Sequence, residues 1–97
     1  MLTSKNRADI KAKLNSEPAV CFVGKEGLTD NVVKSIELAL NAREAIKISL
    51  MQNCDYDTKE LSSMICERLS AETVSLIGRK ILIYRYSPNL SKHVLEN

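Results

Sequence analysis

A strand that runs into a glycine loop and then into a capped helix constrains the fold of this sequence more than any other feature. Residues 19–23, Ala-Val-Cys-Phe-Val, form a continuous apolar run, and residues 24–27, Gly-Lys-Glu-Gly, follow directly. The run is typical of a strand in a sheet that is covered on both faces. Thr29 is a good N-cap for a helix over about residues 30–43. The start of a helix offers free N–H groups and a partial positive charge, so this loop could bind a phosphate backbone.

The rest of the chain reads as alternating helices and strands. Hydrophobic spacing predicts helices over residues 3–15 and about 57–70, and strands over 46–50, 73–77 and 81–86. The caps expected are Thr3 or Ser4 for the first helix and Asp57 for the last. In the last helix, the side chains expected to point inward are Leu61, Met64, Ile65 and Leu69.

The order of these elements predicts an α/β fold, helix-strand-helix-strand-helix-strand-strand. Two strand-helix-strand units imply parallel pairing through right-handed crossovers. If both crossovers move the same way across the sheet, their helices lie on one face, and a two-layer sandwich follows. Gly78 with Arg79 or Lys80 makes the closing hairpin. The first and third strands then point the same way, so residues 24–27 and 78–80 share one end of the sheet. Three strand spacings would separate them by only about 14 Å.

The length of the chain and its cysteines indicate one domain in a reducing compartment. We expect residues 1–87 to form a single domain and residues 88–97 to be a loosely held tail. Three widely spaced cysteines make neither a zinc pattern nor a disulfide framework, which favours a cytoplasmic protein with reduced thiols. No apolar run approaches the roughly 20 residues that span a bilayer, and no signal peptide is visible.

Charge is unevenly distributed along the chain. The net charge is +2, but residues 1–13 and 73–97 each carry +3, whereas residues 44–72 carry −3. A basic pole suits docking on a polyanion, although small domains commonly show some scatter of charge. Lys25, Arg79, Lys80 and Arg85 are the candidates for phosphate contacts, and each could equally be an ordinary solvated charge.

Two further groups of residues are candidates for contact with nucleic acid. Lys47 projects from the face of its strand opposite Ile46 and Ile48, and it could lie on an open sheet face. Tyr84 and Tyr86 could stack on bases, but packing against the core is the more common use of such a pair.

Catalytic chemistry has little support. His93 is the only histidine, and no Ser/His/Asp or Cys/His arrangement is visible. Asp57 is better explained as a helix cap than as half of a catalytic carboxylate pair with Asp55. The loop lacks the G-K-[ST] of a phosphate-binding P-loop and the third glycine of a dinucleotide site. We therefore expect no enzyme activity, cofactor, metal or small-molecule substrate.

Two blocks of the sequence together resemble a known family. Residues 23–29, Val-Gly-Lys-Glu-Gly-Leu-Thr, and residues 77–85, Ile-Gly-Arg-Lys-Ile-Leu-Ile-Tyr-Arg, flank the strand Ile46-Lys47-Ile48. This pattern is similar to the CRM (chloroplast RNA splicing and ribosome maturation) domain, in its free-standing bacterial YhbY-type form. The resemblance covers roughly residues 2–87.

The resemblance implies an RNA-binding domain that takes part in assembly of the large ribosomal subunit. It implies a fold similar to the C-terminal domain of translation initiation factor three, with a four-stranded mixed sheet in the order 1-2-4-3. Matching positions carry the family's functional residues onto this chain, and the turn and loop add three more. The resulting RNA-binding set is Gly24, Lys25, Glu26, Gly27, Thr29, Lys47, Arg79, Lys80 and Arg85. Glu26 departs from the pattern, because an acid in the loop reduces its attraction for phosphate.

The leading hypothesis is a monomeric, non-enzymatic module that binds RNA, expected to be ribosomal RNA in precursors of the large subunit. The alternative is a protein-interaction module in which the acidic helix of residues 57–70 binds a basic ribosomal protein. A small phosphate-handling enzyme ranks last, because no acid–base pair is available.

Overall fold

The computed structural model describes residues 2–95, which form three helices and four strands in the order expected from the sequence. The elements are α1 (Ser4–Leu14), β1 (Cys21–Val23), α2 (Asp30–Arg43), β2 (Ala45–Leu50), α3 (Thr58–Leu69), β3 (Glu72–Ile77) and β4 (Lys80–Tyr84). Within this part of the chain, every helix is too short or too polar to cross a membrane.

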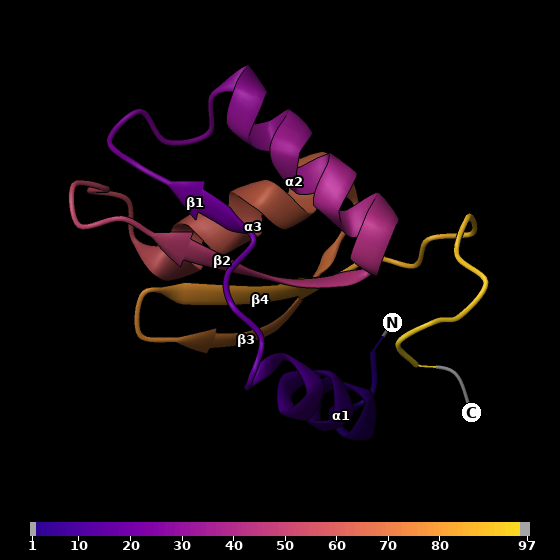
Figure 1. Cartoon of the computed structure of the whole chain (residues 1–97). Coiled ribbons are helices and arrows are strands. Elements are labelled where there is room, and N and C mark those ends of the chain that lie inside the picture. The colour runs from indigo at the N-terminus through magenta and orange to yellow at the C-terminus, as the bar shows by residue number, and fades with distance from the viewer. Residues whose placement is uncertain (1, 96–97) are drawn as a thin grey trace.

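The four strands form one mixed sheet in the order β1-β2-β4-β3, which confirms the predicted order (Figure 1). β1 pairs with β2 in parallel, and β4 pairs antiparallel with both β2 and β3. Strands β1, β2 and β3 therefore run in the same direction, and their carboxyl ends meet at one edge of the sheet. Gly78, with φ of 57°, supplies the left-handed backbone of the hairpin turn between β3 and β4.

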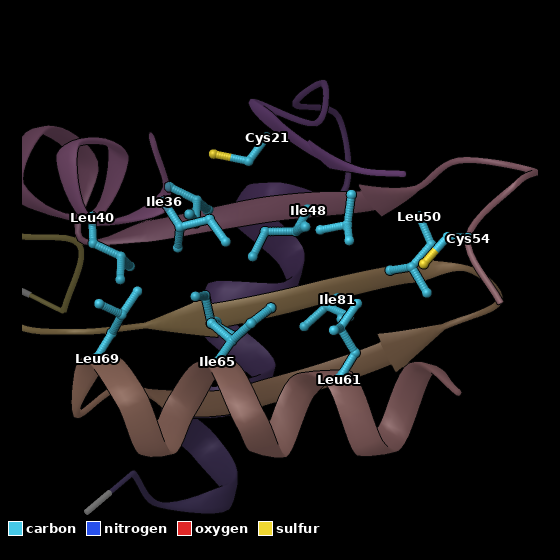
Figure 2. Packing of buried hydrophobic residues seen from close by; sticks show 13 residues of the cluster. Cys21, Ile36, Leu40, Ile48, Leu50, Cys54, Leu61, Ile65, Leu69 and Ile81 are labelled. Atoms are coloured by element: carbon cyan, nitrogen blue, oxygen red, sulfur yellow. The ribbon is translucent and has the colours of Figure 1, made fainter. Parts of the chain in front are cut away.

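Helices α2 and α3 cover one face of the sheet, as the predicted two-layer sandwich requires. The main core lies between them and the strands, and its buried side chains are almost all aliphatic (Figure 2). Ile36 and Leu40 enter it from α2, while Leu61, Ile65 and Leu69 enter it from α3. The predicted caps are present, since Thr29 Oγ1 accepts from Val32 N and Asp57 Oδ2 accepts from Glu60 N.

Helix α1 lies across the opposite face of the sheet (Figure 1). Its Ile10 and Leu14 pack with Ala45, Val74 and Leu82 in a second, smaller core. Thr3 caps the helix through a reciprocal pair of hydrogen bonds with Asn6. Besides this apolar contact, the Arg7 guanidinium donates to the carbonyl of Thr73 on β3. The helix thus covers only part of the face, near the amino end of β2.

The first strand is shorter and more open than the apolar run suggested. β1 spans only Cys21–Val23 and is an outermost strand of the sheet, and the Phe22 side chain is 57% exposed. The expectation that both faces of this strand are covered was wrong. The reason is that α1 packs near the other end of the sheet, so nothing among the described residues buries the Phe22 ring.

The buried stripe of α3 also differs from the prediction at one position. Met64 is 40% exposed, whereas Ser62 is buried. The helix turns this way because it packs against β3, where the Thr73 hydroxyl lies 2.7 Å from Ser62 Oγ and 3.4 Å from Cys66 Sγ. The side of the helix that carries Ser62 therefore lies against β3, whereas Met64 lies outside this contact.

The segment after β4 returns to the turn between α2 and β2. Ser87 is buried, and its Oγ donates to the carbonyl of Asn41 at 2.7 Å. The backbone N–H groups of Ser87 and Val94 both donate to the carboxylate of Glu44. The division of the chain at residue 87 remains a prediction, but these contacts attach part of the predicted tail to the domain.

Candidate nucleic-acid interface

The glycine loop is a tight turn whose conformation requires Gly27. Gly27 N donates to Gly24 O at 3.1 Å, and Thr29 N donates to Gly27 O at the same distance. Gly27 has φ of 70°, in the left-handed region where a side chain is strained. The turn brings Thr29 into position to cap α2, so the loop and the start of the helix form one ordered unit.

The same loop packs closely against the segment that follows β2. A Cβ atom on Gly27 would lie 2.5 Å from the Tyr56 ring, closer than any real contact. A Cβ atom on Gly24 would lie 3.4 Å from Met51 Sδ and 3.5 Å from Asn53 Oδ1. Both glycines therefore allow close packing, in addition to any role toward a ligand. No local pattern predicts the contact with Tyr56, because it arises from the parallel pairing of β1 and β2.

Three loops meet at the carboxyl ends of β1, β2 and β3 (Figure 1). We call residues 24–29, 51–56 and 78–80 together the loop edge. Met51 N donates to Val23 O, and Leu50 N donates to Arg79 O, both at 2.8 Å. These bonds join the glycine loop and the hairpin turn through the segment between them. The predicted juxtaposition of residues 24–27 and 78–80 is therefore present.

Arg79 holds the loop edge together with its guanidinium. Nη2 donates to the carbonyl of Met51 at 2.7 Å and to that of Cys54 at 2.8 Å. A guanidinium nitrogen occupied by two protein carbonyls is poorly placed to bind a phosphate as a fork. We therefore interpret Arg79 as a positioning residue for the loop edge, although its side chain remains exposed at the surface.

Besides Arg79, the exposed charged side chains that the fold brings together from the predicted set are Lys25, Glu26 and Lys80. Lys25 and Glu26 occupy the tip of the glycine loop, and Lys80 is the first residue of β4. β1 and β4 flank β2, so two strand spacings, about 10 Å, separate these two strands, and Lys25 lies two residues beyond the end of β1. The loop edge carries Lys25, Arg79 and Lys80 against Glu26 and Asp55, a net charge of +1.

Two of the predicted residues lie away from the loop edge. Lys47 is half-buried in the middle of β2, and its Nζ donates to the carbonyl of Glu17 at 2.8 Å. The sheet face around it, expected to be open, is crossed by the segment between α1 and β1. Arg85 lies just beyond β4, at the opposite end of the sheet. Its guanidinium donates to Leu69 O at 2.9 Å and to Asn41 Oδ1 at 2.8 Å, which ties α2 to α3.

The two tyrosines considered as stacking platforms are also at the far end of the sheet. Tyr84 is half-buried against the second core, and burial raises the pKa of its hydroxyl. Tyr86 is exposed, but its ring stacks on the His93 imidazole with centroids 4.6 Å apart. Neither tyrosine lies beside the glycine loop.

The described residues contain no group of three His, Cys, Asp or Glu side chains arranged to hold a metal ion. All three cysteines are free. Burial raises the pKa of the Cys21 and Cys66 thiols, which makes them poor nucleophiles near neutral pH.

These features define a small α/β module with a 1-2-4-3 sheet and a glycine loop packed at one sheet edge. The chain belongs to the CRS1/YhbY (CRM) domain family, whose model matches residues 2–85. This finding confirms the resemblance noted in the sequence.

Individual relatives agree with the family assignment. The chain is 36% identical to "Probable RNA-binding protein YqeI" of Bacillus subtilis over 87 residues, covering 90% of this chain and 91% of the relative. It is 30% identical to "Probable RNA-binding protein PA4753" of Pseudomonas aeruginosa, covering 96% and 89%. The solution structure of SAV1595 from Staphylococcus aureus matches with a TM-score of 0.80 and 35% identity, covering 95% of each chain.

Proposed function

We propose that this protein binds RNA at the loop edge, with phosphates bound by Lys25 and Lys80 and by the backbone of the glycine loop. The observation that carries the proposal is the position of these two exposed lysines at the same edge, one in the glycine loop and the other at the start of β4. A chain of phosphates can contact both, because Lys80 begins β4, about 10 Å from β1, and Lys25 lies in the loop that follows β1. The relatives named as RNA-binding proteins support the same assignment.

Gly24, Gly27 and Thr29 contribute to binding through the shape of the loop. Glycines let a phosphate approach the backbone closely, and the start of α2 adds a partial positive charge. Thr29 keeps this helix start in place through its cap on Val32 N. Glu26 limits affinity, so binding should depend strongly on the two lysines.

The RNA we propose is ribosomal RNA in precursors of the large ribosomal subunit, as the resemblance to the YhbY-type proteins implies. The protein would act there as a monomer without enzyme activity or cofactor, in the cytoplasm. Sedimentation of the protein with ribosomal particles, followed by mapping of its crosslinks on the RNA, tests this assignment. Crosslinks confined to other RNAs would refute it.

Charge reversal at the loop edge tests the interface itself. The double variant Lys25→Glu with Lys80→Glu should weaken binding to single-stranded RNA and lower the salt dependence by about one unit of slope per lost phosphate contact. Lys92→Glu is the matched control, because Lys92 is exposed in the tail beyond the far end of the sheet. Equal losses in the double variant and the control, or an unchanged slope in a folded double variant, would refute this interface.

A further inference from the structure

One row of side chains crosses all four strands directly beneath the loop edge. The pairing registers place Phe22 of β1 opposite Ser49 of β2, Ser49 opposite Lys80 of β4, and Lys80 opposite Ile77 of β3. We call Phe22, Ser49, Lys80 and Ile77 the sheet row. Its members are consecutive neighbours in the hydrogen-bonding direction, so the row spans the whole width of the sheet at the end where the glycine loop begins.

The sheet row faces away from the main core. Cys21, Val23, Ile48, Leu50 and Ile81, which flank its members along the strands, all belong to the core beneath α2 and α3. Side chains alternate between faces along a strand, so the row points to the side on which α1 lies. Phe22 is 57% exposed and Ile77 is 42% exposed, and Lys80 is also at the surface.

Helix α1 does not extend over this row. The residues that it covers, among them Ala45, Leu82 and Val74, lie toward the other end of the sheet. The segment between α1 and β1 crosses the sheet at Lys47, where Glu17 accepts a hydrogen bond from its Nζ (Figure 1). A strip of sheet between this crossing and the loop edge is therefore left open, and it contains an aromatic ring and a lysine with Ser49 between them.

We propose that the sheet row is a stacking platform for an unpaired base of the RNA bound at the loop edge, with the base on the Phe22 ring. This inference rests on the proposed function and extends it, because it makes single-stranded RNA the preferred ligand. Phe22 lies directly before Val23 and the glycine loop, and Lys80 is shared by the sheet row and the loop edge. A nucleotide with its phosphate at Lys80 or Lys25 therefore has Phe22 within reach of its base.

Charge complementarity favours RNA as the occupant of this strip. The row combines an aromatic ring, an aliphatic side chain and a cation, and it contains no acid. Single-strand-binding proteins combine these two elements, a positive groove that follows the backbone and aromatic rings on which bases stack. The neighbouring Lys25 extends the positive charge beyond the row toward the loop.

Substitution of Phe22 separates stacking from phosphate binding. In fluorescence anisotropy with a single-stranded RNA of about ten nucleotides, Phe22→Ala should raise Kd roughly 5-fold or more, the effect of losing one base stack. The slope of log K against log salt should stay as in the unmodified protein, since no phosphate contact is lost. Phe22→Tyr should bind normally, whereas Phe22→Leu, which keeps apolar bulk without the ring, should bind like Phe22→Ala.

Two further measurements report the stacking directly. The chain contains three tyrosines but no tryptophan, so Phe22→Trp introduces a single indole that can be excited selectively, and its emission should be quenched when RNA stacks on it. An RNA of the same length with abasic sites should bind the unmodified protein and Phe22→Ala with the same low affinity. Because Phe22 is largely exposed, urea unfolding of each variant should match that of the unmodified protein, which shows that the variants are folded.

The outcomes distinguish this platform from the proposed function. The platform would be overturned if Phe22→Ala bound RNA as tightly as the unmodified protein, and the unmodified protein bound abasic RNA as tightly as intact RNA. The loop edge would remain as the binding site. Self-association of the protein that Phe22→Ala abolishes, without any change in RNA affinity, would assign the row to a second copy and also overturn it. Failure of the unmodified protein to bind any RNA would overturn the proposed function itself.

Discussion

The carboxylate of Glu44 accepts a hydrogen bond from Nδ1 of His93 at 2.6 Å, which joins the C-terminal segment to the turn between α2 and β2. Glu44 is fully buried, and its carboxylate also accepts the backbone N–H groups of Ser87 at 2.9 Å and Val94 at 2.8 Å. Its backbone has φ of 66°, an unusual conformation for a residue other than glycine. One side chain thus attaches the segment after β4 to the domain.

Removal of this carboxylate should cost stability far more than removal of a surface carboxylate. Glu44→Ala leaves three donors without their acceptor in a buried setting, so we expect the free energy of unfolding to fall by about 2–4 kcal/mol. Urea unfolding followed by circular dichroism measures the change. Glu67→Ala, at an exposed site on α3, is the control and should change stability by no more than about 0.5 kcal/mol. A similar, small effect for both substitutions would contradict the structural role of Glu44.

The Glu44 carboxylate should also make stability depend on pH in the acid range. Burial acts to raise the pKa of Glu44, but the hydrogen bonds from Ser87, His93 and Val94 outweigh it and hold the pKa below its ordinary value of 4.5. A carboxyl whose pKa is lower when folded stabilises the protein fully above its unfolded pKa. That contribution is lost as the pH falls from about 4.5 through the lower folded value.

Comparison with Glu44→Gln measures this contribution. The difference in unfolding free energy between the unmodified protein and the variant should narrow as the pH falls from about 5 to 3, where the Glu44 carboxylate becomes protonated. Unfolding curves collected across this range, at constant ionic strength, supply the difference. A gap that stays the same down to pH 3 would show that the folded carboxyl does not have a lowered pKa.

The sequence predicted the fold well because local signals agree with the final topology. Thr3, Thr29 and Asp57 cap the helices as expected, and the strand-helix-strand order leads to the 1-2-4-3 sheet. Hydrophobic spacing was less informative about exposure. It misplaced Phe22 and Met64, because exposure at these positions depends on where α1 ends and on which side of α3 lies against β3.

The site was predicted in part, since charge in a sequence does not reveal which side chains the fold already occupies. Lys25 and Lys80 remain exposed at the loop edge. In a count of charge, Arg79 and Arg85 are equivalent to these two lysines. Their guanidiniums, however, bind backbone carbonyls of the protein. Glu44 carried no local signal, because its donors come from residues 87–94 and meet it only after the sheet has formed.

The contact between Gly27 and Tyr56 predicts a specific sensitivity of the glycine loop. Gly27→Ala combines a left-handed backbone with a Cβ atom 2.5 Å from the Tyr56 ring, so we expect a loss of about 2–3 kcal/mol in unfolding free energy. Gly78→Ala is the matched control, because Gly78 also has a positive φ but has no atom within 4 Å of the added Cβ. Its loss should be only about 1 kcal/mol.

A double variant separates the steric part from the backbone part. Gly27→Ala combined with Tyr56→Ala removes the clash, so the two substitutions together should cost less than the sum of their separate effects. Thermal unfolding of the four proteins in the cycle gives the coupling energy. Strict additivity would mean that the loop moves away from Tyr56 without cost.

The bonds from Arg79 to Met51 and Cys54 predict that its shape matters more than its charge. Arg79→Lys keeps a positive charge at the loop edge but cannot reproduce one guanidinium nitrogen held between two carbonyls. We expect Arg79→Lys to lose about 1–2 kcal/mol of stability and to speed amide exchange at Cys54, whose N–H donates to Met51 O. Lys80→Arg, with a free side chain next in sequence, is the control and should leave both unchanged.

RNA affinity should fall for Arg79→Lys because the glycine loop loses its support, while the salt slope stays the same. An Arg79→Gln variant that keeps the protection of the Cys54 amide but has a reduced salt slope would instead make Arg79 a direct phosphate ligand.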